Sequence, residues 1–184
     1  MTKYISLLRG VNVGGKNKIS MPELKTAFEK RGFENVVTYI NSGNILFDSD
    51  LGLQEAKAAC ENLIEAGFGL NIAVGVITAG HLTDALDHAP EWWNRDADSR
   101  HNAIFAIPPA TAEEIRAAVG EAKPEYESIS CYGSVIFWSA PLKTFSRTRW
   151  SKVVQSKAVY HLITIRNANT TLKLAALAKG CNAK

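Results

Sequence analysis

The chain reads VVTYINSGNILF over residues 36–47, and this stretch decides the fold. Residues 36–40 and 45–47 are runs of β-branched, aromatic and aliphatic side chains, which is the composition of short strands. Ser42 and Gly43 lie between the runs and have the small, flexible character of a tight turn. The two runs are therefore predicted to pair as a β-hairpin, and the fold follows from what flanks it.

The segments on each side of this hairpin have matching patterns. Residues 4–8 form an apolar strand, and Ser20 and Glu23 have the spacing of a capping box that starts a helix. After the hairpin, residues 53–64 repeat apolar side chains at helical spacing, and residues 72–76 alternate as a strand. The predicted order is βαββαβ, the ferredoxin-like arrangement.

The same order is predicted a second time. Residues 102–107 form a strand, Thr111 and Glu114 form another capping box, and residues 129–132 and 135–139 form a hairpin. A helix lined by Trp150, Val153, Val154 and Ala158, a strand over residues 161–165 and a helix over residues 172–178 complete the chain. We predict an α+β fold of two ferredoxin-like βαββαβ halves packed together: residues 1–78, a linking segment 79–100, and residues 101–184 with the C-terminal helix.

Comparison of the two halves isolates one unusual connection. From hairpin tip to last strand both halves span 28 residues, but from first strand to hairpin tip they span 39 and 31. The eight extra residues fall in the connection between the first strand and the first helix, where about two to six residues suffice. Because long ordered loops often carry function, residues 10–19 are the candidate site.

The candidate loop nearly matches a nucleotide-binding motif. Residues 10–17, GVNVGGKN, fit the phosphate-loop pattern G-x-x-x-x-G-K-[ST] except at Asn17, which replaces the magnesium-binding hydroxyl. In a true phosphate loop the helix begins at the lysine, whereas here the capping box delays it to Met21. The pattern therefore argues against a phosphate-loop hydrolase.

A simpler anion-binding role is consistent with the same residues. The glycines of the loop let backbone amides turn toward a ligand, and Arg9, Lys16 and Lys18 place positive charge beside them. The alternative is a surface loop whose glycines permit turns and whose lysines keep it solvated. Loop length and charge favour ligand binding.

Charge is unevenly distributed along the chain. Residues 128–184 contain nine Lys and Arg and no Asp or Glu, whereas residues 1–127 contain 12 basic and 18 acidic residues. This asymmetry indicates either an anionic partner or an intramolecular match between a basic and an acidic half. Arg147 and Lys152 flank Trp150, a mixture that suits phosphate or base contacts and equally suits a solvated helix face.

Several other classes of site find no support. Cys60, Cys131 and Cys181 are widely spaced and predict reduced thiols, and the four histidines lack metal-ligand spacing, so we expect no metal and no cofactor. No apolar run reaches the roughly 18 residues of a membrane span. We expect a cytoplasmic protein that does not bind membranes.

Three motifs resemble one family. Residues 4–19, residues 39–44 and the run Thr164-Ile165-Arg166-Asn167, followed by Thr170 and Leu174, are similar to the bacterial domain-of-unknown-function family 1697. The chain has Ala168 where members often have an aromatic residue. The resemblance covers essentially the whole chain, implies a two-part α+β fold and implies no activity. Its signature positions are Arg9, Asn12, Gly14, Gly15, Lys16, Asn41, Asn44, Arg166 and Asn167.

The leading functional hypothesis is a protein that binds an anionic ligand, either nucleic acid or a phosphorylated metabolite, through the Gly/Lys-rich loop and the basic C-terminal segment. One alternative is an enzyme that acts on a small phosphorylated substrate, and another is a protein-interaction module or homodimer. The predicted ligand-binding residues are Arg9, Asn12, Gly14, Gly15, Lys16, Lys18, Asn41, Asn44, Arg147, Lys152, Arg166 and Asn167.

Overall fold

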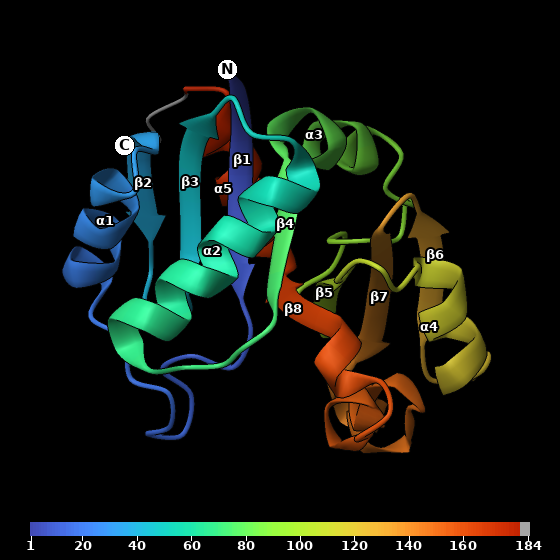
Figure 1. The fold of residues 1–184 in the computed structure, drawn as a ribbon. Coiled ribbons are helices and arrows are strands. Elements are labelled where there is room, and N and C mark those ends of the chain that lie inside the picture. Colours follow the sequence, from blue (N-terminus) through green and yellow to red (C-terminus); the bar gives the residue numbers. More distant parts are fainter. Residues whose placement is uncertain (181–184) are drawn as a thin grey trace. The chain divides into compact units, whose positions relative to one another are not determined.

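The computed structural model describes residues 1–180 and contains two four-stranded antiparallel sheets (Figure 1). By contacts within the chain, unit 1 comprises Met1–Thr83 and the C-terminal stretch that begins at Lys173, and unit 2 comprises Asp84–Leu172. The elements are β1 (Thr2–Leu8), α1 (Met21–Lys30), β2 (Glu34–Tyr39), β3 (Asn44–Ser49), α2 (Leu53–Phe68), β4 (Val74–Thr78), α3 (Ala79–Asp87), β5 (Ser99–Ala106), α4 (Ala112–Val119), β6 (Ser128–Tyr132), β7 (Val135–Pro141), β8 (Ile163–Asn167) and α5 (Ala168–Ala178).

The two sheets have the same topology. Their strand orders are β2-β3-β1-β4 and β6-β7-β5-β8, so each first strand lies between the third and fourth strands of its half. Both sheets are antiparallel throughout, and the hairpins β2-β3 and β6-β7 pair as the turn residues predict. This confirms the prediction of two ferredoxin-like halves.

One face of the first sheet packs against α1 and α2 (Figure 1). Leu24 and Phe28 of α1 and Ile64 of α2 are fully buried in the same cluster as Tyr4 and Phe47 of the sheet. The first helix begins where the sequence predicts, since the Ser20 hydroxyl accepts a hydrogen bond from the Glu23 amide at the start of α1. Ile5 and Leu7, on the other face of β1, are also buried.

The second half departs from the prediction between β7 and β8. The predicted α-helix through Trp150 and Ala158 is wrong: the chain forms three 3₁₀ segments, η1 (Leu142–Arg147), η2 (Trp150–Gln155) and η3 (Tyr160–Leu162). Trp150 and Val153 are buried, whereas Val154 is 47% exposed. With three residues per turn, positions i and i+3 share one side and position i+4 turns away, which explains this burial.

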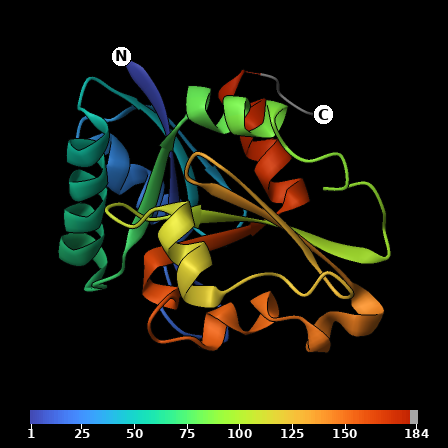
Figure 2. The same ribbon diagram turned by 90° about the vertical axis from the view of Figure 1, so that its right-hand side faces the viewer.

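These 3₁₀ segments cover the second sheet together with α4 (Figure 2). Trp150 and Val153 pack in one cluster with Ile115 of α4 and Ile104 of β5. The Glu127 carboxylate fixes the start of η2, because it accepts hydrogen bonds from the Arg149 amide at 2.7 Å and the Trp150 amide at 3.1 Å. A side chain distant in sequence therefore replaces the local capping that an α-helix would use.

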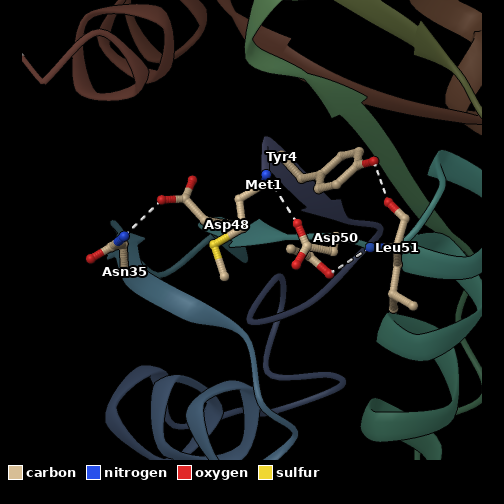
Figure 3. Close-up of polar contacts among 7 residues, drawn as sticks. Met1, Tyr4, Asn35, Asp48, Asp50 and Leu51 are labelled. Carbon is tan, nitrogen blue, oxygen red and sulfur yellow. Dashed lines mark hydrogen bonds and ion pairs between the residues drawn. The ribbon is translucent and has the colours of Figure 1, made fainter.

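Polar contacts close the first sheet at the end where β1 begins and β3 ends (Figure 3). The Tyr4 hydroxyl donates to the Leu51 carbonyl oxygen at 2.6 Å, and the Asn35 amide donates to Asp48 at 2.8 Å. Asp48 also pairs with Lys3 at 2.8 Å. Since β1 leaves the sheet at Leu8, the connection from β1 to α1 lies at the opposite end. Among residues 1–180, no helix combines the length and apolar character that crossing a membrane requires.

Candidate anion-binding loop

The connection between β1 and α1, residues 9–20, is called the Gly/Lys loop here. It has twelve residues, against five (residues 107–111) in the equivalent connection between β5 and α4. Figure 1 shows it extending beyond the ends of the strands of its own sheet. The structure thus confirms that the extra length found by comparing the halves lies in this connection.

The tip of the Gly/Lys loop is a tight hairpin. The Lys16 amide donates to the Val13 carbonyl oxygen at 3.1 Å, and the Asn12 amide donates to the Asn17 carbonyl oxygen at 3.2 Å. Gly14 and Gly15, the two central residues, have φ of +58° and +76°. A two-residue turn with both φ values positive strongly favours glycine, so these glycines give the loop its shape.

Asn12 fixes the base of the loop. Its side-chain oxygen accepts from the Ile19 amide at 2.9 Å, and its side-chain nitrogen donates to the carbonyl oxygens of Ile19 at 2.9 Å and Asn41 at 2.8 Å. These bonds close the loop on itself and tie it to the turn between β2 and β3. Asn12 is therefore a positioning residue whose amide is committed within the protein.

The turn between β2 and β3 packs against the start of the Gly/Lys loop. The Gly43 carbonyl oxygen accepts from the Leu8 amide at 2.8 Å, and a Cβ placed on Gly43 would lie 2.6 Å from Val11 Cγ2 and 2.7 Å from Leu8 Cβ. Asn44 is fully buried, and its side chain donates to the Tyr39 carbonyl oxygen and the Ser42 hydroxyl. Gly43 and Asn44 thus shape a turn against which the loop rests.

The exposed charges of the loop are all positive. Lys16 and Lys18 are exposed, Arg9 is half-buried, and residues 9–20 contain no Asp or Glu. Within residues 1–180, no ion pair or hydrogen bond involves the side chain of Lys16 or Lys18. A hollow of about 560 Å³ lies beside the loop, lined among others by Asn12, Lys18 and Asn41. Its lining residues do not include a carboxylate.

The remaining predicted residues belong to unit 2, whereas the loop belongs to unit 1. Arg147 and Lys152 are exposed on η1 and η2, and the Arg147 guanidinium lies 5.6 Å from the centroid of the Tyr126 ring. Arg166 is buried and donates to the Thr164 hydroxyl and the Ile165 carbonyl oxygen. Burial lowers the pKa of the Arg166 guanidinium to about 10.

Asn167 has a local structural task at the end of β8. Its side-chain oxygen accepts from the Thr170 amide at 2.8 Å, which caps the first turn of α5. This capping role is typical of an Asn that precedes a helix. The apolar pattern of the sequence predicts that the helix starts at residue 172, whereas α5 starts four residues earlier, at Ala168.

The thiol and metal-ligating side chains of the described residues do not form a reactive cluster. Burial raises the pKa of the Cys60 thiol to about 12, which keeps it protonated at neutral pH. Within the described residues, no cluster of three or more His, Cys, Asp or Glu side chains could hold a metal ion. The chemistry that the loop offers is positive charge on a fixed backbone.

Comparisons with known proteins agree with this fold. Residues 1–137 match the sequence model of the family described as Protein of unknown function (DUF1697). The conserved bacterial protein SP0830 from Streptococcus pneumoniae has a similar structure, with a TM-score of 0.86 and 30% sequence identity over 96% of this chain and 98% of that one. A search of curated proteins gives no match.

Proposed function

The chain belongs to the family Protein of unknown function (DUF1697), and from the geometry of its Gly/Lys loop we propose that it binds a phosphate-bearing ligand there. The observation that carries the proposal is the combination of a fixed loop backbone with two exposed lysines that lack a carboxylate partner within residues 1–180. The basic segment with Arg147 and Lys152 is a second contact region in this proposal.

The fixed backbone matters because ordering a flexible loop costs free energy at the moment of binding. The three hydrogen bonds of Asn12 and the glycine turn have already ordered the loop. The ammonium groups of Lys16 and Lys18 have no carboxylate partner within the described chain, so a bound phosphate need not displace one. Phosphate on a polynucleotide and phosphate on a metabolite share this chemistry.

The proposal is tested by titrating the full-length chain, at low salt, with a fluorescent single-stranded RNA, a duplex DNA and a nucleoside monophosphate. We expect binding that the double variant K16A/K18A weakens by about tenfold or more, since hydrogen bonds to charged groups contribute about 1.5–3 kcal/mol. For duplex DNA, each phosphate that the variant no longer neutralises should reduce the slope of log affinity against log salt by about 0.9.

The matched control is K25A/K30A, which removes two positive charges from α1 in the same unit. If this control weakens binding as much as K16A/K18A, the effect is one of net charge and the loop is not the site. Binding of the monophosphate that K16A/K18A weakens, with no binding of RNA or DNA, would identify a metabolite as the ligand of the loop. Absence of binding to all three ligands at low salt would refute the proposal.

A further inference from the structure

Unit 2 contains a polar hollow of about 740 Å³ that is separate from the Gly/Lys loop. It lies where the segment 94–97, the first residues of β5 and the junction of β8 with α5 meet. Its lining includes Arg95, Arg100, His101, Asn102, Asn167 and Asn169. The volume is within the roughly 300–1,000 Å³ of small-molecule sites.

Two arginines of the hollow are held in place by the protein itself. Arg95 Nε donates to the Glu91 carbonyl oxygen at 2.7 Å, and the Arg100 guanidinium lies 4.5 Å from the centroid of the Phe145 ring. A guanidinium that is bonded through Nε, or stacked on a ring, has fewer directions open to its terminal N–H groups than a free side chain. The one acidic lining residue is Asp96, so the formal charge of the lining is positive even with His101 neutral.

His101 makes one wall of the hollow rigid. The residue is only 8% exposed, its Nδ1 lies 2.6 Å from the Ser139 hydroxyl, and its Nε2 lies 2.9 Å from the Asp96 carbonyl oxygen. Because both ring nitrogens have protein partners, His101 ties the segment 94–97 to the sheet. The Asp96 carboxylate, 3.6 Å from Nε2, is also directed toward this histidine.

The junction of β8 and α5 supplies further hydrogen-bonding groups. Asn167 caps α5 through the Thr170 amide, and the first helical residues, Ala168 and Asn169, line the hollow, which places the positive end of the helix dipole there. Within residues 1–180, the side-chain amides of Asn102 and Asn169 have no hydrogen-bond partner. Such amides both donate and accept, which suits hydroxyl or amide groups of a ligand.

We propose that this hollow is a second binding site, for a small organic oxyanion whose uncharged part carries hydroxyl or amide groups. Arg95, Arg100 and the start of α5 hold the phosphate or carboxylate, and Asn102 and Asn169 contact the remainder. The site is independent of the Gly/Lys loop, because every lining residue belongs to unit 2.

The discriminating variant is Asn169→Asp. A carboxylate in the first turn of α5 favours the helix, so the variant retains its stability, but it repels an anion in the hollow. The full-length chain is titrated with inorganic phosphate, AMP and citrate by NMR, with thermal unfolding measured alongside. We expect AMP or citrate to shift the amides of residues 95–102 and 167–169, and N169D to weaken that binding by about tenfold or more.

The variant R95Q should weaken the same binding without creating a new negative charge, and K16A/K18A should leave it unchanged. Loss of binding in K16A/K18A alone would place the ligand at the loop and overturn the second site. The proposal also fails if none of the three probes shifts these amides at millimolar concentration, or if N169D binds them as tightly as the unmodified chain.

Discussion

Replacement of Gly43 by alanine should destabilise unit 1 by about 3 kcal/mol. The backbone at Gly43 has φ of +72°, which costs an L-residue about 1–2 kcal/mol, and the new Cβ would lie 2.6 Å from Val11 Cγ2 and 2.7 Å from Leu8 Cβ. Both neighbours are fully or almost fully buried, so neither has open space to enter. Overpacking of this kind costs about 1–3 kcal/mol.

Gly133 provides the matched control, because it occupies the corresponding hairpin turn of the second half. Its φ is +54°, but a Cβ there would meet no atom within 4 Å. Gly133→Ala should therefore cost only the backbone strain, about 1–2 kcal/mol. The effect of replacing glycine on the unfolded chain is common to both variants and cancels in their difference.

The difference is measured by urea denaturation with two reporters. All four tryptophans lie in unit 2, so their fluorescence follows that unit, and amide hydrogen exchange of β1 and β3 follows unit 1. We expect Gly43→Ala to lower the protection of the β1 and β3 amides by about 1–2 kcal/mol more than Gly133→Ala lowers the stability of unit 2. Equal costs would show that the loop yields to the added methyl group, and the account of a fixed loop would be wrong.

Two further variants test the polar contacts. Burial alone would raise the pKa of Asp48, but hydrogen bonds from Lys3 and Asn35 outweigh burial and lower the pKa. The ionised Asp48 therefore stabilises the folded protein above the ordinary pKa of 3.8, and this stabilisation is lost as the pH falls through the folded-state pKa. Asp48→Asn should thus destabilise the protein at pH 7, and its thermal unfolding should approach that of the unmodified chain in acid. Glu127→Gln should lower the free energy of unfolding in urea by about 3 kcal/mol, because the new amide nitrogen would face N–H donors that bind a carboxylate oxygen in the unmodified chain. The control Glu125→Gln, at an exposed position, should change the stability little.

Local chemistry made most of the fold predictable from the sequence. The capping box of Thr111 and Glu114 forms in both directions at the start of α4, because its partners lie three residues apart. The 3₁₀ segments were not predictable in this way. The start of η2, for example, is fixed by Glu127, which is 22 residues before Arg149, and no local pattern connects the two.

The position of the candidate site was predictable from the sequence, but which of its residues are exposed and which hold the loop in shape was not. Comparison of the halves located the long loop, because loop length is a property of the sequence alone. The family resemblance places Asn12 among the predicted ligand-binding residues, whereas its bond to Asn41, 29 residues away, requires the folded chain. Arg147 and Arg166 likewise have the same charge in the sequence, yet the first is exposed and the second is buried.

The residues of the family-like motifs therefore separate into two physical classes. Asn12, Gly43 and Asn44 are committed to backbone partners or to tight packing, and they determine the shape of the loop. Lys16 and Lys18 are exposed and are the side chains available to a ligand. A residue that only shapes the loop acts on binding through the loop, so its replacement should lower stability and affinity together. Replacement of a lysine that contacts the ligand should lower affinity with little change in stability, and this contrast distinguishes a binding loop from a merely rigid one.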